Sequence, residues 1–243
     1  MEVTSRPEHT RNGLVMLGAD PLKIYYLVVL GTDNPEEVKM KKRPKTFLEI
    51  LEKEHRWPRK GDRLLSRSSD WSRGVEFTSH PISKHVYLWD GYMSAGAGLI
   101  ELCTQDGYEH ERHTVIYPIL FNYRHGLELA MKWIIMMYGG EGMKGVAEDH
   151  NLWALWKQCR SIISHYGPSD EEADDAVEQV VKDFHDLDKA GITFRYGWGK
   201  DGREIRLPDH LVDLENIRDV MAGVAGFFNG LDGWLDDLKS AGP

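Results

Sequence analysis

The sequence has little cysteine and no long apolar run. Its two cysteines, Cys103 and Cys159, both fall in apolar stretches with helical character. We therefore expect buried free thiols rather than a disulfide framework, and a reducing cytoplasm fits this usage. The longest apolar candidate, residues 24–30, has the length of a β-strand, whereas a membrane-spanning helix needs roughly 18 apolar residues. The first residues also lack the basic and then apolar pattern of a signal peptide, so we predict a cytoplasmic protein with no membrane partner.

Positive charge is scarce over most of the chain. The whole sequence carries 30 Lys and Arg against 39 Asp and Glu, a net charge of −9. Residues 1–83 hold 15 basic and 12 acidic side chains, whereas residues 84–243 hold 15 and 27. An acidic body argues against broad, non-specific binding of nucleic acid, although it leaves room for a local basic patch. The run over residues 39–45, Lys-Met-Lys-Lys-Arg-Pro-Lys, is one candidate, and a solvated segment is the alternative.

The N-terminal part has the texture of strands and turns. Apolar runs over residues 14–18 and 23–30, separated by Ala-Asp-Pro, predict a β-hairpin. A cap at Thr46 with Glu three residues later predicts a short helix that ends near residue 54. Residues 56–82 are rich in Pro, Gly and Ser, and we expect an irregular segment held by Trp57 and Trp71.

From residue 84 onward, apolar periodicity predicts five helices. They are expected over residues 84–103, 114–138, 149–166, 169–189 and 211–238. The fold class is therefore mainly α, an antiparallel bundle of about five helices with a small N-terminal β-hairpin and irregular region. We expect residues 1–56 to form the appendage and residues 57–243 to form the bundle.

Two details within these helices bear on packing. The first helix contains Gly91, Gly96 and Gly98, which each cost about 1 kcal/mol of helix propensity relative to Ala. They would let a neighbouring helix approach closely. The second helix contains Pro118, which we expect to be tolerated only in its first turn.

The second helix places charged residues beside its apolar face. At 100° per residue, Arg124 falls inside the apolar arc and Glu128 falls at its margin, with His125 on the flank. A lone buried guanidinium is too costly, so Arg124 needs a partner, and Glu128 four residues later can supply one. The pair is either a buried contact that fixes helix register or part of a site for a ligand or an RNA phosphate.

The third helix has an uninterrupted apolar stripe, which predicts a core face. The stripe comprises Leu152, Leu155, Trp156, Cys159, Ile162, Ile163 and Tyr166. His150 stands just before it. We predict that His150 caps the helix, and its imidazole is also placed to reach a neighbour.

Several of these segments resemble the HEPN superfamily of helical-bundle proteins. Residues 123–132, Tyr-Arg-His-Gly-Leu-Glu-Leu-Ala-Met-Lys, resemble its R-H-x-x-E-L-x-L-K helix, and residues 150–156 resemble its H-D-L-x-x-L-W segment. Residues 194–196 and 200–202 resemble the F-R-Y-P and D-x-x-G loop of one uncharacterised bacterial branch, which residues 216–221 of the last helix also match. The resemblance covers about residues 57–238. The sequence departs from it at Asn151, where Asp is usual, and at Gly197, where Pro is usual.

The resemblance implies an all-α, often dimeric bundle whose catalytic members are metal-independent ribonucleases. Their signature is an Arg followed four to six residues later by a His, and Arg160 and His165 fit that spacing. The His would act as general acid or base on the ribose and the leaving oxygen, and the Arg would stabilise charge developing on phosphorus. Two such sites would meet across a dimer axis. A chance spacing is the alternative, because the two residues lie about 140° apart on an ideal helix.

We therefore expect a HEPN-like homodimer that binds or cleaves RNA in a bacterial defence or toxin–antitoxin system, with an antitoxin or another protein as partner. A polar cluster would support the site or bind a ligand. Its predicted members are Arg124, His125, Glu128, His150, Arg195 and Tyr196. The alternative function is a non-catalytic interaction module that binds a partner protein or a nucleotide.

No metal or cofactor is expected. The G-x-G-x-x-G over residues 140–145 follows a helix rather than a strand, so it lacks the setting of a dinucleotide-binding loop. His110 and His113, with Glu109 beside them, lack a third metal ligand at a fixed spacing.

Overall fold

The computed structural model describes residues 59–105, 107–140, 149–189, 191–198, 202–204 and 207–241. The predicted hairpin, the short helix after Thr46, the basic run over residues 39–45 and the boundary at residue 56 lie outside these residues. Over the described part, the chain is mainly α-helical, as predicted, and its β-structure there is one isolated bridge between Trp198 and Glu204.

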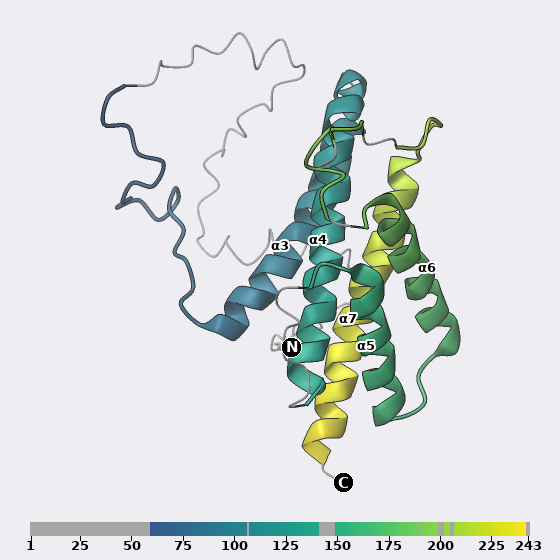
Figure 1. Cartoon of the computed structure of the whole chain (residues 1–243). Helices are drawn as coiled ribbons and strands as arrows, with labels where there is room; N and C mark the ends of the chain where they lie inside the picture. The colour runs from purple at the N-terminus through teal and green to yellow at the C-terminus, as the bar shows by residue number, and fades with distance from the viewer. Residues whose placement is uncertain are drawn as a thin grey trace, which may run out of the picture. The chain divides into compact units, whose positions relative to one another are not determined.

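Five α-helices make up the described part of the bundle (Figure 1). They are α3 (Pro81–Cys103), α4 (Arg112–Tyr138), α5 (Leu152–Tyr166), α6 (Glu171–Leu187) and α7 (Leu214–Ala241), and a short 3-10 helix, η1 (Glu109–Glu111), precedes α4. Each begins and ends within three residues of its predicted bounds. None of these helices is long and apolar enough to cross a membrane.

Helix α4 makes the most extensive contacts of the described helices, mainly with α3 and α5 and also with α7. It has more buried residues than any other helix in the described chain. These are Ile119, Tyr123, Arg124, Gly126, Leu127, Glu128, Ala130, Met131, Lys132, Trp133, Ile134, Ile135 and Tyr138. The apolar residues among them form one core with the apolar stripe predicted for α5. The first six residues of that stripe are buried, as predicted, while its last residue, Tyr166, is half-buried. Full burial of a Leu or Ile side chain contributes about 1.5–3 kcal/mol, so this core is the main source of stability.

The helices do not all alternate in direction. Helix α3 runs antiparallel to α4, and α5 runs antiparallel to α6, as short links require. In contrast, α5 runs parallel to α4, because the contacts advance together from His150 on Glu128 to Tyr166 on Tyr138. The connection over residues 139–151 is long enough for this course, since 13 residues reach about 43 Å when extended and the return along α4 is about 15 Å.

A close approach of a neighbouring helix was predicted at the three glycines of α3, and it occurs at one of them. A Cβ on Gly96 would lie 2.9 Å from the ring of Tyr123, so α3 and α4 touch there with no room for a side chain. Gly91 and Gly98 instead face open space, and the prediction is wrong for them. On the opposite helix, Gly126 receives the side chain of Met93 in the same way.

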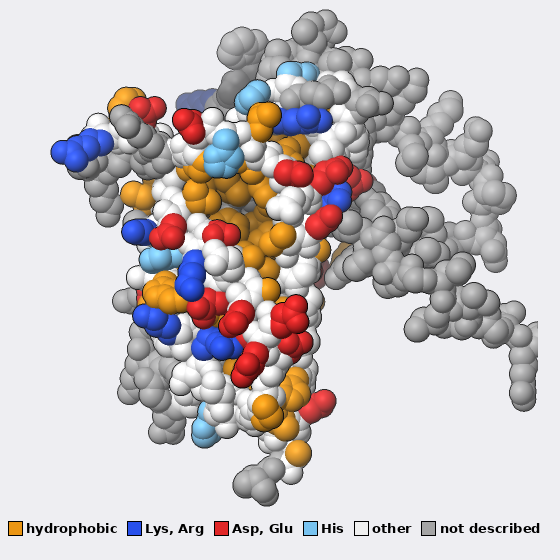
Figure 2. All heavy atoms as spheres, turned by 90° about the vertical axis from the view of Figure 1, so that its right-hand side faces the viewer, with side chains coloured by type: hydrophobic (Ala, Val, Ile, Leu, Met, Phe, Trp, Pro, Cys, Tyr) orange, Lys and Arg blue, Asp and Glu red, His pale blue; other side chains and the backbone are white. Residues whose placement is uncertain are grey.

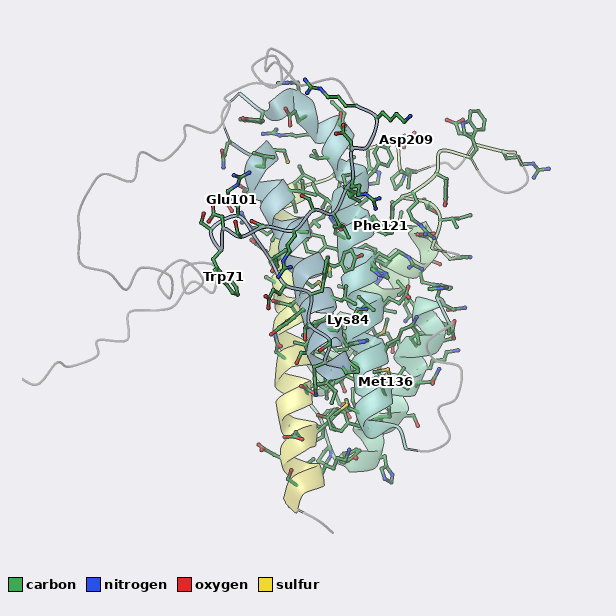
Figure 3. The ribbon with its side chains drawn as sticks, turned by 90° about the vertical axis from the view of Figure 1, so that its left-hand side faces the viewer. Trp71, Lys84, Glu101, Phe121, Met136 and Asp209 are labelled. Atoms are coloured by element: carbon green, nitrogen blue, oxygen red, sulfur yellow. The ribbon has the colours of Figure 1, made fainter. Side chains whose placement is uncertain are left out.

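Two other expectations need correction. Helix α4 begins earlier than predicted, so Pro118 lies at its seventh residue rather than in its first turn. The carbonyl of Thr114 then lacks its usual N–H donor, but Thr114 and Pro118 are both exposed and water can satisfy it. Residues 59–80 contain no helix, as expected. Trp71, labelled in Figure 3, is 81% exposed, so it does not hold this segment in place, and Trp57 lies outside the described residues.

Both cysteines are buried free thiols, as predicted. Cys159 lies in the core of α5 and its thiol donates to the carbonyl of Met131 at 3.5 Å. Burial raises the pKa of the Cys159 thiol well above its usual range. Burial also raises the pKa of the Cys103 thiol, and neither group is available as a thiolate.

Candidate functional site

The centre of α4 carries a buried charge cluster, made of Arg124, Glu128, Lys132 and Asp188. Arg124 is only 4% exposed, and its Nη1 donates to Glu128 Oε2 at 3.1 Å, the partner predicted from the helical spacing. Its Nε lies 3.1 Å from Asp188 Oδ2. Its Nη2 donates to the main-chain oxygens of His150, at 2.9 Å, and Asp188, at 3.2 Å. All three guanidinium nitrogens are therefore held by the protein itself.

Glu128 is the second hub of the buried charge cluster. Its Oε1 accepts hydrogen bonds from Lys132 Nζ at 2.8 Å and from His150 Nδ1 at 2.9 Å. Burial alone would raise the pKa of the Glu128 carboxyl, but these hydrogen bonds outweigh it and hold the pKa below its usual range. Two cations and two carboxylates balance one another within the cluster, which is the condition for burying such groups.

Asp188 was not among the predicted residues, although it fastens the end of α6 to α4. Its Oδ1 accepts from the backbone N–H groups of Ile192, at 2.7 Å, and Thr193, at 3.0 Å, while Oδ2 faces Arg124. Gly191 follows with φ +70°, and a Cβ there would lie 3.4 Å from the guanidinium. The only sequence signal was an Asp and a Gly in a helix-terminal loop, which does not reveal a partner 64 residues away.

A second group, the aromatic cluster, surrounds His125 on the flank of α4. The His125 ring stacks on Phe121, with centroids 5.8 Å apart, and meets the edge of Tyr92 at 4.5 Å. Arg195 lies over the rings of Phe121, at 5.8 Å, and Tyr196, at 5.6 Å. Burial lowers the pKa of His125, so this imidazole is neutral at pH 7.

The six residues predicted for the polar cluster thus lie in two adjacent groups beside α4. Arg124 and Glu128, with His150 in contact, belong to the buried charge cluster. His125, Arg195 and Tyr196 belong to the aromatic cluster. One correction concerns His150, which we expected to cap the third helix. The cap of α5 is Asn151, whose Oδ1 accepts from the backbone N–H of Ala154 at 3.0 Å. His150 contacts Glu128 instead, because the residue one position earlier points back toward α4.

Arg160 and His165 have separate surroundings on α5. Arg160 is one-third exposed and its Nη1 pairs with the buried carboxylate of Asp174 in α6, which also accepts from the Ser169 hydroxyl. His165 is exposed in the last turn, where its ring stands edge-on to Tyr166 at 5.6 Å. Within the described chain no hydrogen bond or ion pair joins Arg160 to His165. The helix stays regular to Tyr166, so the two side chains are not drawn to one point.

An apolar groove of about 1540 Å³ lies among the described residues. Figure 2 shows it as a hollow of hydrophobic side chains with charged groups around it. Its apolar lining comes from α4 (Ile116, Tyr117, Leu120), α6 (Ala176, Val180, Phe184, Leu187), α7 (Leu214, Ile217, Val220, Met221) and the segment before α7 (Leu207, Pro208, Leu211, Val212). The groove could not be predicted from the sequence, because it depends on which parts of three helices remain uncovered after folding.

Among the described residues, no group of three or more His, Cys, Asp or Glu side chains is placed to hold a metal ion. No family model, curated protein or solved structure matches the chain. Membership of the HEPN superfamily therefore stays a prediction from the sequence.

Proposed function

We propose that this protein is an interaction module that holds an α-helix of a partner protein in the groove between α4, α6 and α7. The observation that carries the proposal is the groove itself. It exposes apolar side chains from three helices over one continuous hollow, and Tyr117, Val220 and Leu211 in its lining are all exposed. Large apolar surfaces left open on a folded protein mark sites of association.

The polar residues of the bundle favour binding over catalysis. The guanidinium of Arg124 and the carboxylate of Glu128 spend their hydrogen-bonding capacity on each other and on neighbouring groups. Arg160 is likewise engaged by Asp174. Groups that satisfy one another in this way stabilise the arrangement of helices and leave little capacity for a substrate.

The dimensions of the groove fit a short helix. Its lining follows α6 from Ala176 to Leu187, a length of about 17 Å at 1.5 Å per residue. A helix of that length has about three turns. An amphipathic helix would place its apolar face in such a hollow, with anchors at i, i+3 or i+4, and i+7.

The proposal is tested with a fluorescently labelled model peptide of about 14 residues, with Leu on one helical face and Gln elsewhere. Saturable binding, followed by fluorescence anisotropy, is expected for the wild type. The double variant Tyr117→Asn with Val220→Asn should bind at least about tenfold more weakly, since roughly 1.4 kcal/mol corresponds to tenfold. Met136→Asn is the control, because Met136 is an exposed residue of α4 outside the groove lining (Figure 3). Equal binding by all three proteins would place the peptide elsewhere and end the proposal.

A second candidate function is metal-independent cleavage of RNA by a HEPN-like homodimer, in a defence or toxin–antitoxin setting. It is supported by the surface position of both signature residues, since His165 is exposed and Arg160 is one-third exposed on the same helix. His165 would exchange protons with the ribose, and Arg160 would have to leave Asp174 to meet the phosphate.

The test is cleavage of RNA in EDTA by wild type, His165→Ala and Arg160→Lys, with light scattering to measure the oligomeric state. Arg160→Lys keeps a cation beside the buried Asp174, which Arg160→Ala would leave without its ion-pair partner. His110→Ala, another exposed histidine, serves as the matched control. Loss of cleavage in the two signature variants alone is expected for this candidate. Absence of cleavage, or cleavage untouched by His165→Ala, rejects it.

A further inference from the structure

The rim of the groove carries an excess of carboxylates. Asp183 and Asp186 lie on α6, and Asp213 and Glu215 lie at the start of α7. All four are exposed, and within the described residues none of them forms an ion pair. Asp213 Oδ1 caps α7 by accepting from the backbone N–H groups of Glu215, at 3.0 Å, and Asn216, at 3.1 Å, and Asp183 accepts from the Gln179 amide at 2.9 Å. None of the four pairs with a Lys or Arg of the described chain, so the rim keeps a net negative charge toward whatever enters the groove.

Little positive charge opposes them. Among the described residues of the lining, the only Lys or Arg is Arg112, and its Nε donates to the main-chain oxygen of Cys103 at 3.0 Å, at the C-terminal end of α3. That end of a helix is the favoured place for a cation, so the guanidinium is directed at α3 rather than across the groove. Apart from the carboxylates, the other ionisable groups of the described lining are His113, His210 and the Tyr117 hydroxyl.

We infer that the groove selects a basic amphipathic helix, with an apolar face for the groove floor and Lys or Arg side chains on both flanks for the carboxylates of α6 and α7. The inference rests on the proposed function and names the chemistry of the partner. Asp183 and Asp186 are three residues apart and share one side of α6, so they would face one flank of the bound helix. Asp213 and Glu215 would face the other.

The carboxylates around the groove also disfavour two other classes of ligand, which are RNA and anionic membranes. RNA and anionic membranes both present phosphate groups, which the net negative charge of the rim repels. A basic helix has the opposite sign and also offers the apolar face that the lining needs. Complementary charge of this kind raises the rate of association and weakens with salt, because exposed charges are screened within about 10 Å at 0.1 M.

The experiment compares three labelled peptides with the same Leu face and with Lys, Gln or Glu at the polar positions. At low salt, we expect the Lys peptide to bind about tenfold more tightly than the Gln peptide and the Glu peptide to bind most weakly. The difference should shrink at about 0.5 M salt. Asp183→Asn with Asp186→Asn should remove most of the preference for Lys. The matched control is Glu172→Gln with Asp175→Asn, which removes the same charge from exposed positions of α6 outside the groove lining.

The outcomes separate the inference from the proposed function. Equal binding of the Lys and Gln peptides overturns the inference and leaves helix binding intact. An equal loss of Lys preference in both double variants also overturns it, because the effect would then come from net charge alone. Failure of all three peptides to bind overturns both. Tighter binding of anionic vesicles or RNA than of the Lys peptide would likewise overturn the inference.

Discussion

Gly96 has the least room for a side chain of the described glycines. A methyl group there would lie 2.9 Å from the Tyr123 ring, which is itself buried between α3 and α4. Gly96→Ala should therefore lower the free energy of unfolding by about 1–3 kcal/mol, since overpacking moves helices apart. Urea denaturation measures this change. Gly98→Ala on the same helix has open space around it and should raise stability by up to about 1 kcal/mol. Two changes of the same sign would contradict the assigned contact.

Glu128 gives the bundle a dependence on acid. Glu128→Gln leaves Arg124 and Lys132 buried with only Asp188 to balance them, which should cost about 3–5 kcal/mol at pH 7. The folded protein holds the pKa of Glu128 below its unfolded value, so this stabilisation is complete above that value and is lost as the pH falls through the folded pKa.

The stability difference between wild type and Glu128→Gln should thus shrink as the pH falls below about 4. Urea unfolding at a series of pH values measures it. A difference that grows as the pH falls would reverse the assigned sign.

At the scale of single residues, the sequence revealed Glu128 as the partner of Arg124, because a helix places residues i and i+4 together. It could not reveal Asp188, whose approach depends on how α6 returns to α4.

Among the helices, α7 combines a packed face with an open one. Met221, Val224, Phe228, Leu231 and Leu235 are buried, whereas Gly223, Gly226, Gly230 and Gly233 are exposed and a Cβ on any of them would meet nothing within 4 Å. Such glycines lower helix propensity without any compensating contact in the described chain.

Gly223→Ala with Gly233→Ala should therefore stabilise the protein by about 1–2 kcal/mol, because Ala restricts the unfolded chain and suits a helix better. Thermal unfolding should show a correspondingly higher midpoint. A lower midpoint would mean that the outer face of α7 touches something in solution, which light scattering of the wild type would then identify as self-association or exclude.

The elements themselves followed from sequence periodicity, and their arrangement did not. The apolar stripe of α5 could be predicted, because it depends only on residues within a few positions of one another. The parallel course of α4 and α5 was not, because short-link reasoning fails for the longer connection over residues 139–151. The predicted cap, His150, lies one residue before the true cap, Asn151. The contact of His150 with Glu128 shows why that one residue matters.

For the molecule as a whole, the uneven charge of the chain reappears around the groove. Residues 84–243 contain 27 acidic side chains against 15 basic ones, and four of those carboxylates border the groove. Composition alone indicated that nucleic acid is a poor general partner. It could not indicate an apolar hollow, since a groove is made by three helices that each look ordinary in sequence.

The burial of both thiols has a kinetic consequence. Cys103 and Cys159 have no exposed surface, so a maleimide or disulfide reagent reaches them only when the bundle opens. Cys103 ends α3 and Cys159 lies in the middle of α5. Their separate labelling rates would therefore record whether α3 detaches before the rest or whether the whole bundle opens in one event. The two native cysteines therefore report on the order of unfolding without any engineered probe.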